Sequence, residues 1–177
     1  TLNENLIAEI DQVRDTTPNG KPDSWACDVY TTLTNNNRLH QRPAFREFTG
    51  LVQQALAAFG EVMGYDLAPG DLEITQCWVN IYQTGMSQEI HHHPNNIMTG
   101  VYYLKAPADC SEILFHSPYA DVMIRPPVIE DDPLNNPIAA IRPEPGDLII
   151  FDSALRHSVP TSEIDGERIS ISFNARF

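Results

Sequence analysis

Short β-rich runs alternate with turns of Gly, Pro and Asn from residue 72 to the C-terminus, and this pattern limits the fold more than any other feature of the sequence. The runs span residues 72–82, 99–104, 112–115, 147–151 and 168–177. They show no repeat period, and many short strands without a repeat are typical of two packed β-sheets. We therefore expect a jelly roll over residues 71–177.

Two apolar stripes at helical spacing precede the β-rich region. The first contains Leu2, Leu6, Ile7, Ile10 and Val13, and the second contains Phe48, Leu51, Val52, Ala55, Leu56, Phe59, Val62 and Met63. Pro43 suits the first turn of the second helix, and Gly64 suits its end. With a strand-like piece at residues 28–33, residues 1–70 are expected to supply supporting helices and an early strand. A length of 177 residues fits one domain, 1–177, that is mainly β with N-terminal helices.

Residues 121–142 interrupt the strands with a stretch rich in Pro and acidic residues. Strand-like runs resume on both sides, so we expect a long excursion within the jelly roll rather than a linker between domains. Long loops in compact domains are often functional, so a lid or substrate loop is one interpretation. An insertion that the fold merely tolerates is the other.

Charge and cysteine content restrict the partners and the compartment. The chain has 11 Lys and Arg against 24 Asp and Glu, a formal net charge of −13, which disfavours nucleic-acid binding. No apolar run approaches the roughly 18 residues of a membrane span, and no signal peptide is visible.

Cys27, Cys77 and Cys110 are scattered and lack C-x-x-C spacing, so we expect buried, reduced thiols in a cytoplasmic compartment. Nothing in the sequence indicates an oligomeric state.

Three consecutive histidines, His91, His92 and His93, are the strongest candidate for a chemical site. Side chains alternate faces along an extended backbone, so His91 and His93 would point one way and His92 the other. Together with the distant His157 they would supply three imidazoles, a ligand set that suits a first-row transition metal. The alternative is a polar loop and an incidental surface histidine.

A metal-binding imidazole must be neutral and must be oriented through its second ring nitrogen. Glu89, Asp152 and backbone carbonyls are the candidate partners in this sequence. His40 and His116 have no comparable context, and we expect them to be structural or surface residues.

The last β-rich run carries a candidate anion-binding side chain, Arg168. Its apolar residues Ile169, Ile171, Phe173 and Ala175 alternate with the polar residues Arg168, Ser170, Ser172 and Asn174. If the apolar set faces the outer packing layer, Arg168 and Ser170 share an interior face, where they could bind a carboxylate. The alternative is a strand-edge arginine paired with one of the many acids. Tyr82 and Tyr103 either present a phenol to a bound anion or fill the core.

Several segments together resemble the 2-oxoglutarate/Fe(II)-dependent dioxygenase superfamily, and more narrowly a group of bacterial and phage oxygenases related to prolyl hydroxylases. The segments are residues 78–82 with Gly85, His91-x-His93-Pro94, 99–104, 145–151, His157-x-Val159-Pro160 and 167–174. The resemblance covers roughly residues 72–177. It implies a double-stranded β-helix, a cupin-like jelly roll with supporting helices.

The resemblance also implies roles for single residues. His91 and His157 match iron ligands, Arg168 matches the partner of the 2-oxoglutarate C5 carboxylate, and Ser170 matches its hydrogen-bonding neighbour. Tyr82 and Tyr103 match positions at which related enzymes place a phenol near 2-oxoglutarate.

One position departs from the superfamily pattern. The usual facial triad is His-x-Asp/Glu…His, and here His93 occupies the carboxylate position. An imidazole there leaves the iron site one negative charge poorer. Either three histidines hold the metal, as in some cupin dioxygenases, or another ligand replaces His93. A register that uses His93 and Asn95 is a further alternative.

The function expected from the resemblance is that of an enzyme, a hydroxylase that uses Fe(II), 2-oxoglutarate and O2. Its substrate would be a peptidyl proline, another protein side chain or a small metabolite. A cupin-like metal protein that does not use 2-oxoglutarate, such as a three-histidine dioxygenase or an isomerase, is the second hypothesis. A non-catalytic jelly-roll module with incidental histidines is the third.

Overall fold

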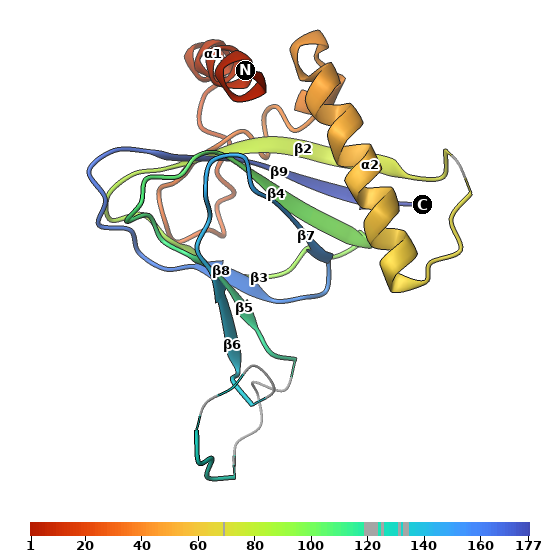
Figure 1. The fold of residues 1–177 in the computed structure, drawn as a ribbon. Helices are drawn as coiled ribbons and strands as arrows, with labels where there is room; N and C mark the ends of the chain where they lie inside the picture. Colours follow the sequence, from red (N-terminus) through yellow and green to blue (C-terminus); the bar gives the residue numbers. More distant parts are fainter. Residues whose placement is uncertain (69, 119–123, 125, 131, 133–134) are drawn as a thin grey trace.

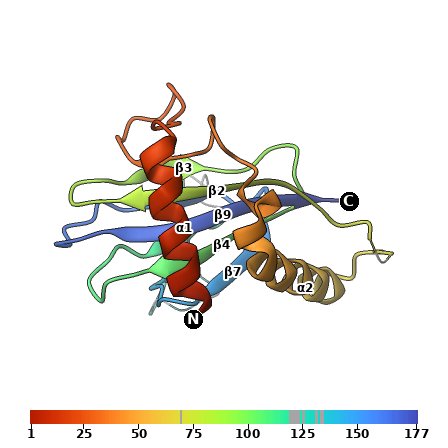
Figure 2. The same ribbon diagram turned by 90° about the horizontal axis from the view of Figure 1, so that it is seen from above.

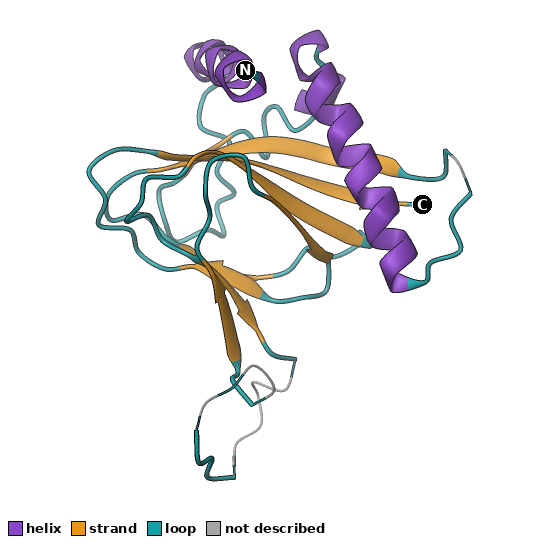
Figure 3. Ribbon diagram, in the orientation of Figure 1, coloured by secondary structure: helices purple, strands orange, loops and turns teal. Residues whose placement is uncertain are grey.

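The computed structural model describes residues 1–68, 70–118, 124, 126–130, 132 and 135–177. In this part of the chain, two α-helices lie on one face of a five-stranded sheet, and a four-stranded sheet lies on the other side (Figure 1). Seen from above, α1 crosses over β2, β9 and β4 (Figure 2). Coloured by secondary structure, the chain is mainly strand and loop, with the helices confined to one side (Figure 3).

Both helices form where the apolar stripes predicted them. The first, α1 (Leu2–Thr16), begins at a capping box in which the Thr1 side chain accepts from the Glu4 backbone N–H, and it buries residues four and three positions apart. Two short 3-10 turns, η1 (Leu39–Gln41) and η2 (Pro43–Phe45), lead into α2 (Arg46–Met63). Gly64 follows α2 with φ of 70°, the left-handed conformation that glycine adopts without strain.

The strands form two antiparallel sheets. The larger has the order β1-β2-β9-β4-β7 and the smaller has the order β3-β8-β5-β6. The strands of the larger sheet are β1 (Tyr30–Thr31), β2 (Glu73–Tyr82), β4 (Met98–Lys105), β7 (Leu148–Asp152) and β9 (Arg168–Arg176). Those of the smaller sheet are β3 (Gln88–His91), β5 (Ile113–His116), β6 (Ile138–Ile141) and β8 (His157–Val159).

The main core lies between the helices and the larger sheet. It joins residues of α1 and α2 to the outward face of β9: Leu6, Ile10, Val13, Phe48, Val52, Leu56, Ile169, Ile171, Phe173 and Ala175. The alternation predicted for the last strand is therefore confirmed, because Arg168, Ser170, Ser172 and Asn174 line a cavity on the opposite face. Packing one face of β9 against the helices thus directs its polar face toward the smaller sheet.

The expected mainly β fold with N-terminal helices is confirmed, but three strands had no local signal. β3 and β8 contain only four and three residues, and β6 lies within the stretch expected to be an excursion. Such short segments become strands because the neighbouring strands of the sheet supply their hydrogen-bond partners. The early strand is also shorter than expected, since β1 contains two residues.

Part of the excursion at residues 121–142 lies outside the described residues, including 121–123 and 133–134. Near its C-terminal end, Ile138–Ile141 pair with β5 and so belong to the smaller sheet. The stretch expected to be a long excursion therefore contains a strand near its C-terminal end.

The three cysteines are free. Cys77 and Cys110 are buried as expected, whereas Cys27 is partly exposed. In the described part of the chain, no helix combines the length and the apolar character needed to cross a membrane.

Candidate functional site

His91, His93 and His157 converge between the two sheets, although 66 residues of sequence separate the first from the last. His91 ends β3, His157 begins β8, and the two are direct partners in the antiparallel register. One ligand atom from each histidine lies within 4.8 Å of the others. His92 is exposed, as strand alternation predicted. Asn95 does not line the cavity, so the alternative register is not supported.

Backbone carbonyls orient two of the three imidazoles. The Nδ1 of His91 donates to the carbonyl of Glu89 at 2.8 Å, and the Nδ1 of His157 donates to the carbonyl of Leu155 at 3.0 Å. Because a carbonyl can only accept, each ring carries its proton on Nδ1 and leaves the Nε2 lone pair available. The Asp152 carboxylate was the wrong candidate, since it accepts from the Ala154 backbone instead.

The third imidazole is oriented by a side chain that the sequence did not point to. The Nδ1 of His93 lies 2.7 Å from the Oδ1 of Asn174, and its ring stacks on Trp78 with 5.8 Å between ring centres. The Nε2 of His93 is buried and has no hydrogen-bond partner among the described residues. Asn174 was visible only as the last polar residue of the alternating set on β9.

Burial keeps these histidines neutral. It lowers the pKa of His157 to about 3 and that of His93 to about 4, and it also lowers the pKa of His91. Phe151 packs edge-on against His157, with ring centres 4.8 Å apart, and contributes to this apolar surrounding. Neutral imidazoles with free Nε2 lone pairs are the form that binds metals. The cluster therefore fits a first-row transition metal.

Arg168 is the second unusual feature of the same cavity. Its side chain is 2% exposed, and its Cζ lies 5.0 Å from the ring centres of both Tyr82 and Tyr103. Its Nη2 donates to the Tyr103 hydroxyl at 3.2 Å, whereas its Nε and Nη1 have no partner among the described residues. No carboxylate in the described part of the chain pairs with it, so the alternative of a strand-edge ion pair is wrong.

The two tyrosines remain protonated phenols. Burial raises the pKa of Tyr82 to about 12 and raises the pKa of Tyr103, and the nearby Arg168 charge opposes both shifts. The Tyr103 oxygen accepts from Arg168, which leaves its own proton free to be donated. A buried guanidinium with two unused N–H groups beside such a hydroxyl suits a carboxylate ligand.

One cavity of about 530 Å³ connects the histidine cluster and Arg168. Ser170 also lines it, as expected from its position on β9. His40 and His116 do not, and His116 instead contacts the Ser158 hydroxyl at 2.8 Å. The structure thus brings all seven predicted site residues to one cavity: His91, His93, His157, Arg168, Ser170, Tyr82 and Tyr103.

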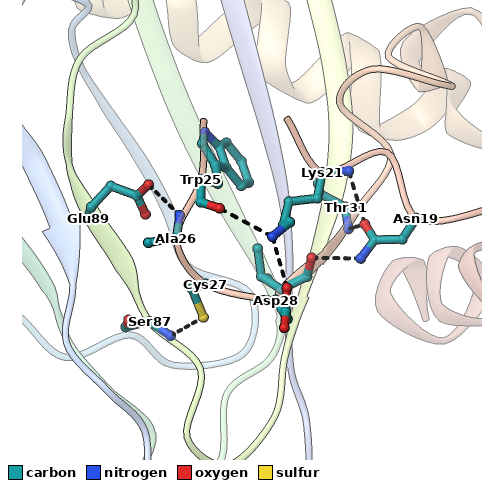
Figure 4. A network of polar contacts seen from close by, with 10 residues as sticks. Asn19, Lys21, Trp25, Ala26, Cys27, Asp28, Thr31, Ser87 and Glu89 are labelled. Carbon is teal, nitrogen blue, oxygen red and sulfur yellow. Dashed lines mark hydrogen bonds and ion pairs between the residues drawn. The ribbon is translucent and has the colours of Figure 1, made fainter. Parts of the chain in front are cut away.

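The segment that carries Trp25 lies beside Glu89 and Ser87 (Figure 4). Trp25 itself lines the cavity, which the sequence did not predict. The Ala26 N–H donates to the Glu89 carboxylate at 3.1 Å, and the Ser87 N–H donates to the Cys27 Sγ at 3.0 Å. These contacts tie the segment to β3 and to the turn before it, close to His91. No periodic pattern marks this segment, because its position depends on contacts with a distant strand.

Comparison with known proteins identifies the family of this chain and solved structures that share its fold. The sequence profile of the family described as "Putative 2OG-Fe(II) oxygenase" matches residues 76–174, more than half of the chain. No curated protein matches the chain.

Solved structures share the fold. A prolyl-4-hydroxylase from Pseudomonas putida has a TM-score of 0.64 and 16% identity over 99% of this chain and 85% of that one. HygX from Streptomyces hygroscopicus, solved with nickel and 2-oxoglutarate, has a TM-score of 0.65 and 11% identity over 99% and 78%. SnoN, an alpha ketoglutarate dependent epimerase from nogalamycin biosynthesis, has a TM-score of 0.68 and 13% identity over 99% and 71%. The expected double-stranded β-helix is therefore confirmed.

Proposed function

This chain belongs to the 2OG-Fe(II) oxygenase family, and from that membership we propose that its cavity is the active site of a hydroxylase that uses Fe(II), 2-oxoglutarate and O2. The observation that carries the proposal is the presence of a three-histidine cluster and an unpaired, buried arginine in one cavity. A metal protein that does not use 2-oxoglutarate has no evident need for that arginine. A buried guanidinium without an anionic partner is costly to a fold, which favours a ligand that supplies the anion.

The residues that line the cavity fit both Fe(II) and 2-oxoglutarate. His91, His93 and His157 would hold Fe(II) through neutral imidazoles whose candidate ligand atoms lie within 4.8 Å of one another. Iron bound there supplies the chemistry by which O2 and 2-oxoglutarate convert a substrate C–H bond to C–OH, with succinate and CO2 as the other products.

The chain's own groups bind and orient the cosubstrate. Arg168 would pair with the distal carboxylate of 2-oxoglutarate through its unused Nε and Nη1 groups, and Tyr103 would donate its hydroxyl proton to the same carboxylate. Ser170 would add a hydroxyl from the same face of β9, and the Tyr82 ring packs against the guanidinium. Phe115 and Phe151 would limit access of water to the His157 side of the site.

The remaining lining favours an uncharged substrate group. Among the described residues that line the cavity, Arg168 carries the one permanent charge. Trp78 Nε1, Asn80 Oδ1 and Gln88 Oε1 are buried and have no partner among the described residues. The group that enters the cavity is therefore uncharged and carries both hydrogen-bond donors and acceptors. A peptide segment with the reacting side chain, or a neutral polar metabolite, meets this description.

Anaerobic titration tests the proposal against both alternatives. Metal-free protein is loaded with Fe(II), its metal content is measured, and 2-oxoglutarate is added while the visible spectrum is recorded. We expect one metal per chain and a saturable metal-to-ligand charge-transfer band. Metal binding without the band would contradict 2-oxoglutarate use and favour the cupin-like alternative. Absence of metal binding would contradict both and favour a non-catalytic module.

A further inference from the structure

The three histidines differ in what orients them. For His91 and His157 the partner is the backbone carbonyl two residues earlier, which no substitution removes. For His93 the partner is the side chain of Asn174, 81 residues later in the chain and on the other sheet. The orientation of His93 therefore depends on one replaceable side chain.

Asn174 is itself held in place by two neighbours. Its side chain is buried, and its Oδ1 accepts from the Thr99 hydroxyl as well as facing His93. Its Nδ2 donates to the Oε1 of Gln76 at 2.9 Å. Since an amide nitrogen donates and an amide oxygen accepts, these contacts hold the amide with its oxygen toward His93.

This arrangement determines the tautomer of His93. Asn174 Oδ1 can only accept, so the proton of the imidazole lies on Nδ1 and the lone pair lies on Nε2. That Nε2 is buried without a partner among the described residues. His93 belongs to the cluster in which one ring nitrogen from each histidine lies within 4.8 Å of the others. If the amide were reversed, its N–H would face Nδ1 and the proton would move to Nε2, which would block metal binding.

We propose that Asn174 is the positioning residue that makes His93 a metal ligand at the place where the superfamily triad has a carboxylate. The inference rests on the proposed metal site and adds a residue to it. In consequence β9 serves both halves of the site, because the polar face that presents Arg168 at one end presents Asn174 near the other. An amide partner also makes the ligand less basic than a carboxylate partner would.

Metal titrations of purified variants test the inference, with Co(II) alone as the probe. Asn174→Leu removes the acceptor at similar size, Asn174→Asp keeps an acceptor, and Ser172→Ala is the matched control on the same face of β9. Losing such an outer partner typically weakens metal binding about 10–100-fold, and we expect this for Asn174→Leu. Asn174→Asp should stay within about threefold of the parent or bind more tightly, and Ser172→Ala should be unchanged.

A double variant separates positioning from general destabilisation. His93→Ala combined with Asn174→Leu should bind Co(II) no more weakly than His93→Ala alone, because Asn174 acts only through His93. The visible Co(II) spectrum of Asn174→Leu should shift toward that of His93→Ala. Thermal melts check folding, and Asn174→Val, which favours strands and lacks an acceptor, replaces the leucine variant if that variant does not fold.

Two results would overturn the inference: unchanged Co(II) affinity in Asn174→Leu, or a full additional loss in the double variant. Failure of the proposed function has a different signature. In that case the parent itself would not bind Co(II), or His157→Ala would bind it as tightly as the parent.

Discussion

Tyr82 and Arg168 are direct partners in the antiparallel register of β2 and β9, and the Arg168 Cζ lies 5.0 Å from the centre of the Tyr82 ring. This pairing buries a permanent positive charge that no carboxylate of the described chain neutralises. A buried guanidinium without a carboxylate partner favours the binding of an anionic ligand, and the first prediction concerns this ligand.

Arg168→Ala should retain its metal but lose 2-oxoglutarate. Leaving one charge of a buried pair unpaired costs about 3–5 kcal/mol, which corresponds to about two to three orders of magnitude in affinity. Arg168→Lys should recover part of the loss, because an ammonium keeps the charge but not the planar fork. Calorimetric titration of the metal-loaded variants measures this. Equal 2-oxoglutarate affinity in parent and Arg168→Ala would exclude the assigned role.

Tyr103→Phe should weaken 2-oxoglutarate binding by about one to two orders of magnitude, because a hydrogen bond to a charged group contributes about 1.5–3 kcal/mol. Tyr102→Phe is the matched control, since the neighbouring hydroxyl faces α1 and donates to Asn3 at 2.6 Å. That control should bind 2-oxoglutarate normally. Equal binding losses in the two variants would show that the Tyr103 hydroxyl has no specific role.

His93→Ala should weaken metal binding more than about 100-fold, beyond the usual loss of an outer partner, while His92→Ala should change it by less than about threefold. The reason is geometric: His93 faces His91 and His157, and His92 is exposed. Metal titration of both variants distinguishes them. Equal losses would mean that His93 is not a ligand.

Gly100→Ala should destabilise the fold, because a Cβ at this position would lie 2.3 Å from Phe173 Cζ and 2.9 Å from the Ile149 carbonyl oxygen. Overpacking of a core typically costs about 1–3 kcal/mol. Gly50→Ala, in the interior of α2 with nothing within 4 Å, should instead raise stability by up to about 1 kcal/mol. Denaturant unfolding of both variants measures the free energy of unfolding. An unchanged free energy of unfolding in Gly100→Ala would contradict the close packing around Gly100.

Much of the site could be read from local sequence because strand alternation has a fixed period. That period predicted that Arg168 and Ser170 share a face, that His91 and His93 point together, and that His92 points away. The two helices could likewise be predicted from their apolar stripes, and the end of the second helix could be predicted from Gly64. These features depend on residues close together in the chain.

The missed features depend on contacts between distant segments. β8 contains three residues and exists because β3 and β5 pair with it on either side. Asn174 reaches His93 across 81 residues, and Trp25 reaches the cavity on a segment tied to Glu89. No periodicity records such partners, so the sequence offered Glu89, Asp152 and backbone carbonyls and did not single out Asn174.

A crystal structure of the protein, grown with 2-oxoglutarate and with nickel as a stand-in for Fe(II), would show directly whether the cavity binds both groups. Anomalous scattering at the nickel edge locates the metal, and the electron density locates the cosubstrate. We expect one nickel bound by the Nε2 atoms of His91, His93 and His157, with the distal carboxylate of 2-oxoglutarate on Arg168. A metal bound elsewhere, or 2-oxoglutarate absent from Arg168 at saturating concentration, would contradict the proposed function.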